Sequence, residues 1–179
     1  MTTVISGTNR SSSRTLSIAR HLSEYLNSQD QPVRLLDLSA LPDGWISPEM
    51  YSEGGQSREL RKWQERYINS ADRFIIVTPE YNGGYAGALK MFIDAISVHR
   101  YAENFMGKWT ALVGVATGRS GNLRGLDQLT QSLLYMGGHV LPGVLPVSQV
   151  AALIDDTGKV SDEPTRESLN KLADRLVQQ

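Results

Sequence analysis

A strand, a glycine-rich loop and a helix follow one another between residues 74 and 96, and this unit limits the folds open to the chain. The run 74–77 (FIIV) is apolar, as in a buried strand, and the apolar residues of 89–96 recur at helical spacing. Gly83, Gly84 and Gly87 lie between them. Open α/β sheets bind ligands at the carboxyl ends of strands, and glycines let backbone N–H groups approach a flat ligand closely.

Strand-like and helix-like segments alternate along the rest of the chain. We expect strands at residues 3–6, 33–38, 73–77, 109–116 and 139–147, the last broken by Pro142, Gly143 and Pro146. Helices are expected at 15–26, 60–71, 89–96, 126–136 and 169–176, with a long loop at 41–57. This alternation favours one α/β domain over residues 1–179, a three-layer α/β/α sandwich. Five parallel strands fit the flavodoxin-like order 2-1-3-4-5.

Composition excludes several classes of function. The chain has no cysteine, so disulfides, zinc–thiolate sites, iron–sulfur clusters and thiol catalysis are ruled out. Eighteen basic and nineteen acidic residues give a net charge of −1, which does not indicate a nucleic-acid or membrane-surface partner. No apolar run is long enough to span a membrane, and no apolar leader precedes the first strand, so we expect a cytoplasmic protein.

The loop after the first strand is rich in groups that bind phosphate. Residues 7–15 (GTNRSSSRT) offer five hydroxyls, the guanidiniums of Arg10 and Arg14, and the N-terminus of the next helix. The alternative is that Ser12 or Ser13 only caps that helix. Neither a P-loop nor the G-x-G-x-x-G dinucleotide motif is present, so the phosphate of a mononucleotide is the better inference.

A third loop, residues 116–125 (ATGRSGNLRG), follows the fourth strand. Taken alone, such a loop is most often a turn. In the order 2-1-3-4-5 the first, third and fourth strands are neighbours, so the loops that follow them meet at one edge of the sheet. We therefore expect one site for a ligand with an anionic group at the first loop and a planar ring near the other two.

These segments resemble the NADPH-dependent FMN reductase family. Residues 7–15 are similar to its G-S-x-R-x-x-S-x-N phosphate loop. Residues 79–94 (PEYNGGYAGALKMFID) resemble its P-E-Y-N-x-x-x-P-G-x-L-K-N-x-I-D signature, which is the more specific pattern. Residues 117–121 lie where the family has a glycine-rich flavin loop, and residues 156–160 resemble the tail of these proteins. Thr15, Ala86 and Met91 depart from the pattern, which has Asn, Pro and Asn there.

The resemblance implies a set of FMN-binding residues. At the phosphate these are Thr8, Arg10, Ser12, Ser13 and Thr15. Against the isoalloxazine ring, largely through backbone groups, they are Pro79, Glu80, Tyr81, Asn82 and Gly83. At the pyrimidine end of the ring they are Thr117, Gly118, Arg119, Ser120 and Gly121.

The resemblance also implies an enzyme that passes hydride from NADPH or NADH through FMN to a small-molecule electron acceptor, with the two substrates binding in turn. The cofactor carries this chemistry, so no catalytic side chain and no metal are expected. A homodimer or homotetramer is implied as well. The alternatives are an electron carrier like flavodoxin, or a flavin-binding module without turnover.

Two polar features have ordinary structural explanations. We expect the carboxylate of Glu80 to accept a hydrogen bond from backbone within its turn rather than act as a general acid. Lys90 and Asp94 are four residues apart, and we expect an ordinary helical ion pair.

Overall fold

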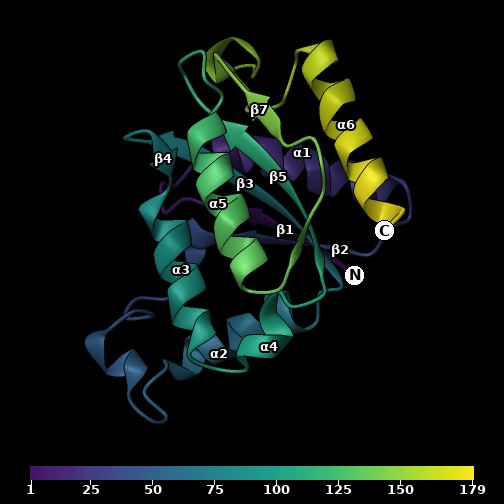
Figure 1. Ribbon diagram of the computed structural model, residues 1–179. Helices are drawn as coiled ribbons and strands as arrows, with labels where there is room; N and C mark the ends of the chain where they lie inside the picture. Colours follow the sequence, from purple (N-terminus) through teal and green to yellow (C-terminus); the bar gives the residue numbers. More distant parts are fainter.

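The computed structural model describes residues 1–179. Six α-helices accompany the sheet: α1 (Arg14–Ser28), α2 (Arg58–Gln64), α3 (Gly87–Ser97), α4 (Tyr101–Asn104), α5 (Leu123–Tyr135) and α6 (Glu163–Val177). The strands are β1 (Thr2–Ser6), β2 (Val33–Asp37), β3 (Arg73–Tyr81), β4 (Gly84–Tyr85), β5 (Trp109–Val115), β6 (His139–Val140) and β7 (Leu145–Val147). Figure 1 shows the strands crossing the middle of the molecule between two groups of helices. No helix is long and apolar enough to cross a membrane.

The sheet has the predicted flavodoxin-like order. Its path is β2-β1-β3-β5-β6, and the pairs along this path are parallel. The fifth position is split: β6 pairs with the start of β5 and β7 with its end, because the chain between them contains Pro142 and Gly143, which interrupt a strand. The remaining strand, β4, lies off this path and is a short antiparallel partner of β3. The predicted order is confirmed, and only the strand count differs.

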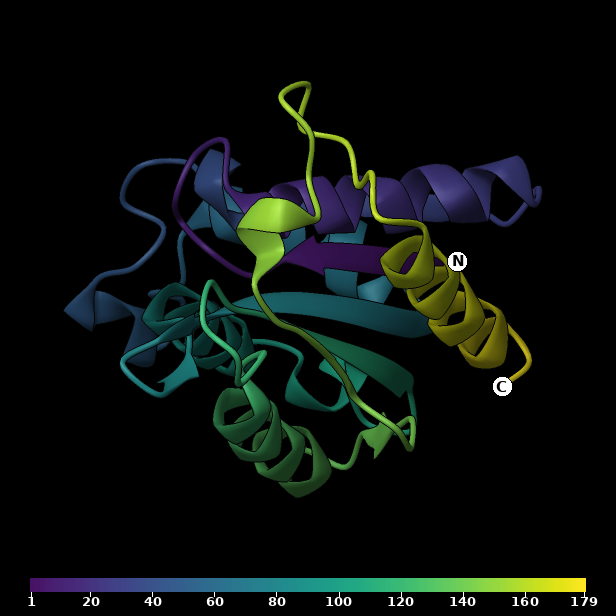
Figure 2. The same ribbon diagram turned by 90° about the horizontal axis from the view of Figure 1, so that it is seen from above.

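Two apolar cores lie on opposite faces of the sheet. One face packs against α1 and α6 through buried residues such as Ile18, Leu22 and Leu172. The other packs against α2, α3 and α5 through residues such as Leu60, Phe92 and Leu129. Figure 2, seen from above, shows this division into three layers. The central strand β3 is buried on both faces, which is why 74–77 is continuously apolar.

The hairpin at the end of β3 differs from the expected loop. β3 continues through Pro79 to Tyr81 and turns back at Asn82 and Gly83 into β4. Both turn residues have positive φ, 53° and 76°, which is the geometry that an Asn-Gly pair favours in a two-residue hairpin. The Asn82–Gly83 dipeptide was therefore an available signal for this turn.

The helix expected at 60–71 also differs in detail. It consists of α2 followed by a π-helical turn at Glu65–Asn69. Lys108 donates from Nζ to the carbonyl oxygens of Ile68 and Asn69, at 3.0 and 3.3 Å, and so binds carbonyls at the end of that turn. Burial lowers the pKa of Lys108. The long loop at 41–57 contains a short 3₁₀ helix at Pro48–Tyr51.

Candidate functional site

The loops after β1, β3 and β5 meet at one edge of the sheet, as predicted. They line a cleft of about 630 Å³, which we call the main cleft. This volume lies within the range of small-molecule and cofactor sites, about 300–1,000 Å³. The cleft is therefore large enough for a mononucleotide with a planar ring.

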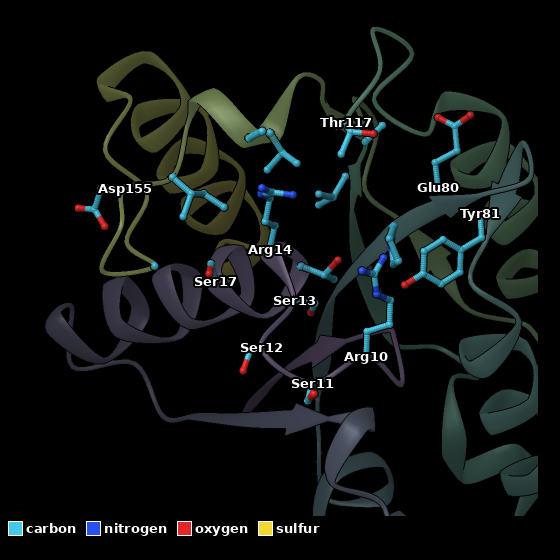
Figure 3. A pocket seen from close by; sticks show the side chains of 18 of the residues that line it. Arg10, Ser11, Ser12, Ser13, Arg14, Ser17, Glu80, Tyr81, Thr117 and Asp155 are labelled. Atoms are coloured by element: carbon cyan, nitrogen blue, oxygen red, sulfur yellow. The ribbon is translucent and has the colours of Figure 1, made fainter.

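One end of the main cleft is cationic. Arg10, from the loop before α1, and Arg14, the first residue of α1, extend into it (Figure 3). Neither takes part in any ion pair of the protein. Ser13 is the N-cap of α1, because its Oγ accepts a hydrogen bond from the N–H of Leu16 at 3.1 Å. The capping role considered above thus applies to Ser13, whose hydroxyl hydrogen remains free to donate. The N-terminus of α1 and the unpaired guanidiniums of Arg10 and Arg14 together favour the binding of an anion at this end of the cleft.

The end of β3 connects the other two loops through consecutive side chains. Tyr81 reaches the β1 side, where its hydroxyl is 2.8 Å from Thr8 Oγ1. Glu80 reaches the β5 side, where its Oε2 accepts a hydrogen bond from the hydroxyl of Ser120. Consecutive strand residues point to opposite faces of the sheet, so the two side chains leave β3 in opposite directions. Because β3 lies between β1 and β5, the loops that follow both neighbours are within reach of its end.

These contacts change two expectations about single residues. The carboxylate of Glu80 is bound by a side chain from another loop, not by backbone within its own turn. Thr8 is fully buried and does not line the main cleft. In addition to its contact with Tyr81, its Oγ1 accepts a hydrogen bond from the N–H of Arg10 at 3.3 Å.

Thr78 of β3 is hydrogen-bonded to the residues just before α3 and α5. Thr78 Oγ1 accepts a hydrogen bond from the N–H of Ala86, and its carbonyl accepts one from Nδ2 of Asn122. Gly125 of α5 lies directly against the backbone of Gly84 and Tyr85, where a Cβ atom would come within 2.5 Å of the Tyr85 nitrogen. The hairpin is thus packed tightly on α5.

The predicted site residues divide into two groups. Those that line the main cleft are Arg10, Ser12, Ser13, Thr15, Pro79, Glu80, Tyr81 and Thr117. Those that lie outside its lining are Thr8, Asn82, Gly83, Gly118, Arg119, Ser120 and Gly121, of which Thr8 and Gly121 are buried.

One wall of the cleft was not predicted. It comes from the segment after β7 and includes Val150, Ala151, Ile154 and Asp155. Asp155 Oδ1 accepts hydrogen bonds from the hydroxyl and N–H of Thr157 and from the N–H of Lys159. The bond from the Thr157 hydroxyl, followed by that from the Lys159 N–H, lowers the pKa of Asp155. The sequence indicates a turn at Asp155–Gly158, but no local pattern shows that this turn lies beside the cleft.

The expected ion pair is confirmed, with Lys90 Nζ 2.7 Å from Asp94 Oδ1 on the exposed side of α3. No group of three or more His, Asp or Glu side chains is arranged to hold a metal ion.

Comparisons with known proteins decide the family. Residues 2–152 match the model of the NADPH-dependent FMN reductase family. The chain belongs to this family. An NAD(P)H-dependent FMN reductase from Pseudomonas aeruginosa is 31% identical over 141 residues, which cover 78% of this chain and 73% of that protein. A quinone reductase from Pseudomonas putida is 29% identical, with 97% of this chain and 91% of the relative covered.

A solved structure shows the same fold over the whole chain. It is FerB, a flavoenzyme NAD(P)H:(acceptor) oxidoreductase from Paracoccus denitrificans, with a TM-score of 0.79 and 24% identity, covering 99% of this chain and 94% of FerB. Family membership confirms the predicted class of function, an NAD(P)H-dependent oxidoreductase that uses FMN.

Proposed function

We propose that the main cleft binds FMN with its phosphate between Arg10 and Arg14 and its ring between the β3–β4 hairpin and the loop of residues 117–121. The unpaired arginines are the observation that carries this proposal, because two uncompensated cations beside a helix N-terminus fit a phosphate dianion. The hydroxyls of Ser12, Ser13 and Thr15 supply further donors at the same end.

The protein groups bind and orient the cofactor. FMN, when bound, supplies the ring that accepts and donates hydride. Tyr81 and Glu80 hold the hairpin to the two neighbouring loops, so backbone N–H groups of Asn82, Gly83 and Gly121 keep fixed positions beside the ring. Fixed donors of this kind stabilise developing negative charge without reorganisation. No side chain is assigned an acid or base role.

Anaerobic reduction tests this function directly. Protein loaded with FMN should lose its long-wavelength flavin absorbance when NADPH or NADH is added, and a small quinone should restore it. A quinone is the first acceptor to try, because the Pseudomonas putida relative that covers 97% of this chain is a quinone reductase. A yellow protein that neither nucleotide reduces would indicate an electron carrier instead.

The Glu80–Ser120 contact gives a prediction about the cofactor's potential. Glu80→Gln removes a negative charge beside the ring but keeps an acceptor for Ser120. Reduced FMN should then bind about 3- to 10-fold more tightly relative to oxidised FMN, which raises the two-electron potential by about 15–30 mV. Ser120→Ala keeps the charge and breaks the contact, so both redox forms should bind more weakly and the potential should stay unchanged. Equal shifts of potential in both variants would contradict this assignment.

We also propose a homodimer or homotetramer formed through the outer faces of α3, α4 and α5. Large apolar side chains are exposed there: Met91, Tyr101, Leu134 and Tyr135, the last at 88%. Tyr101 and Tyr135 line a hollow of about 500 Å³. Exposed apolar side chains that cluster on one face are typical of protein–protein interfaces. Tyr135→Glu should shift the sedimentation coefficient towards the monomer, and an unshifted assembly would place the interface elsewhere.

The proposed compartment is the cytoplasm, where nicotinamide nucleotides supply the hydride. Fractionation of cells that produce the tagged chain tests this, and recovery with the membranes or outside the cell would contradict it.

A further inference from the structure

A second polar hollow adjoins the phosphate end of the main cleft. It has a volume of about 530 Å³, and we call it the side hollow. Ser17, Asp155 and Gly158 line both spaces, so the two are neighbours across one helical turn of α1 and one chain turn. A Cβ atom at Gly158 would lie 3.7 Å from Ser17 Oγ, which shows how closely that turn approaches the helix.

Three elements build the side hollow. The side chains of α1 that line it are Ser17, Arg20, His21 and Glu24, at helical spacing beyond Arg14. The opposite wall is the turn of residues 155–161, and Arg166 contributes from the first turns of α6. His21 Nε2 is 2.9 Å from Asn170 Oδ1, a contact that holds α1 to α6 beside it.

The charges of the side hollow favour an anion. Neither Arg20 nor Lys159 takes part in any ion pair of the protein, and Arg166 pairs only with the exposed Glu163 at 3.0 Å. Its two carboxylates are Glu24 and Asp155, and Asp155 Oδ1 accepts hydrogen bonds from the backbone N–H groups of Thr157 and Lys159. The three cations of the lining, Arg20, Lys159 and Arg166, therefore outnumber its carboxylates. Arg20 and Lys159 are thus available to bind phosphate oxygens.

We propose that the side hollow is a subsite for the adenosine monophosphate half of FAD, so that the protein accepts FAD as well as FMN. The flavin and first phosphate would occupy the main cleft as FMN does. The second phosphate would pass Ser17 towards Arg20 and Lys159, and the nucleoside would lie along α1. The volume suits a nucleotide-sized group. This inference rests on the proposed FMN site.

Titration of the apoprotein with FMN and with FAD, followed by flavin fluorescence, tests the subsite. Wild-type protein should bind FAD with a Kd within about tenfold of that for FMN. The double substitution Arg20→Gln, Lys159→Gln removes two charge-assisted contacts and should weaken FAD binding by about tenfold or more while FMN binding changes by less than about threefold. Glu24→Gln should act in the opposite direction and tighten FAD binding.

Arg58→Gln with Lys62→Gln on α2 is the charge-matched control, because α2 lies on the other face of the sheet. It should leave both affinities unchanged. FAD binding more than about 100-fold weaker than FMN binding would overturn the subsite, as would a double variant that weakens FMN and FAD equally or weakens neither. Wild-type protein that binds no FMN would overturn the FMN site itself, and the subsite with it.

Discussion

Replacing Arg10 and Arg14 together by glutamine is expected to weaken FMN binding by about 100-fold or more. Hydrogen bonds to charged groups contribute roughly 1.5–3 kcal/mol each, and two such contacts to one phosphate would be lost. The effect should be concentrated at the phosphate. Riboflavin, which has the same ring and no phosphate, should bind the double variant and the wild type with nearly equal affinity. Isothermal titration of the apoprotein with FMN and with riboflavin measures both.

The control for this experiment removes two positive charges elsewhere. Arg58→Gln with Lys62→Gln changes the exposed surface of α2 by the same net charge. FMN affinity should be unchanged in it. If the double variant of Arg10 and Arg14 kept the wild-type affinity, the phosphate would lie elsewhere and the arginines would serve another ligand. Equal losses for FMN and riboflavin would indicate damage to the fold of the loop.

The lining of the main cleft by residues 10–15 was predictable because these residues are adjacent in sequence. Residues 10–15 follow a strand and precede a helix, so their meeting point depends only on local structure. The wall formed by Val150 and Ile154 was not predictable in this way. Its place in the cleft depends on how the chain returns after β7, which is a tertiary arrangement without a local pattern.

The contacts of Glu80 and Tyr81 lie between these cases. Their opposite directions follow from strand alternation, once β3 is known to extend to Tyr81. The sequence suggested a loop there, because glycines and a proline surround the segment. Had Asn82–Gly83 been interpreted as a two-residue hairpin turn, the prediction would have extended β3 to Tyr81. It would then have placed the side chains of Glu80 and Tyr81 on opposite faces of the sheet.

Ala86 has a structural explanation that the family pattern does not supply. Its backbone N–H donates to Thr78 Oγ1 at 3.3 Å, just before α3 begins. Proline, the residue of the family pattern at this position, has no N–H to donate. In this chain the start of α3 is therefore fixed by a hydrogen bond to β3 rather than by a proline ring.

Gly125→Ala is expected to destabilise the protein by about 1–3 kcal/mol, although alanine favours a helix over glycine by about 1 kcal/mol. The added Cβ would lie 2.2 Å from Asn122 Oδ1, 2.5 Å from the Tyr85 nitrogen and 2.7 Å from the Gly84 carbonyl carbon. The last two atoms are backbone, so the hairpin must move away from α5. Because the hairpin carries Asn82 and Gly83, FMN affinity should fall with stability.

Gly87→Ala is the matched comparison for Gly125→Ala, because it makes the same substitution at a helical glycine where the added Cβ meets no neighbour. Gly87 is the first residue of α3, its φ is not positive, and a Cβ there would meet no atom within 4 Å. This substitution should stabilise the protein by about 0.4–1 kcal/mol by restricting the unfolded chain. Urea unfolding of both variants gives the comparison. If Gly125→Ala stabilised the protein as Gly87→Ala does, the hairpin would not be packed on α5, and the ring side of the site would lack the rigid support on which its backbone donors depend.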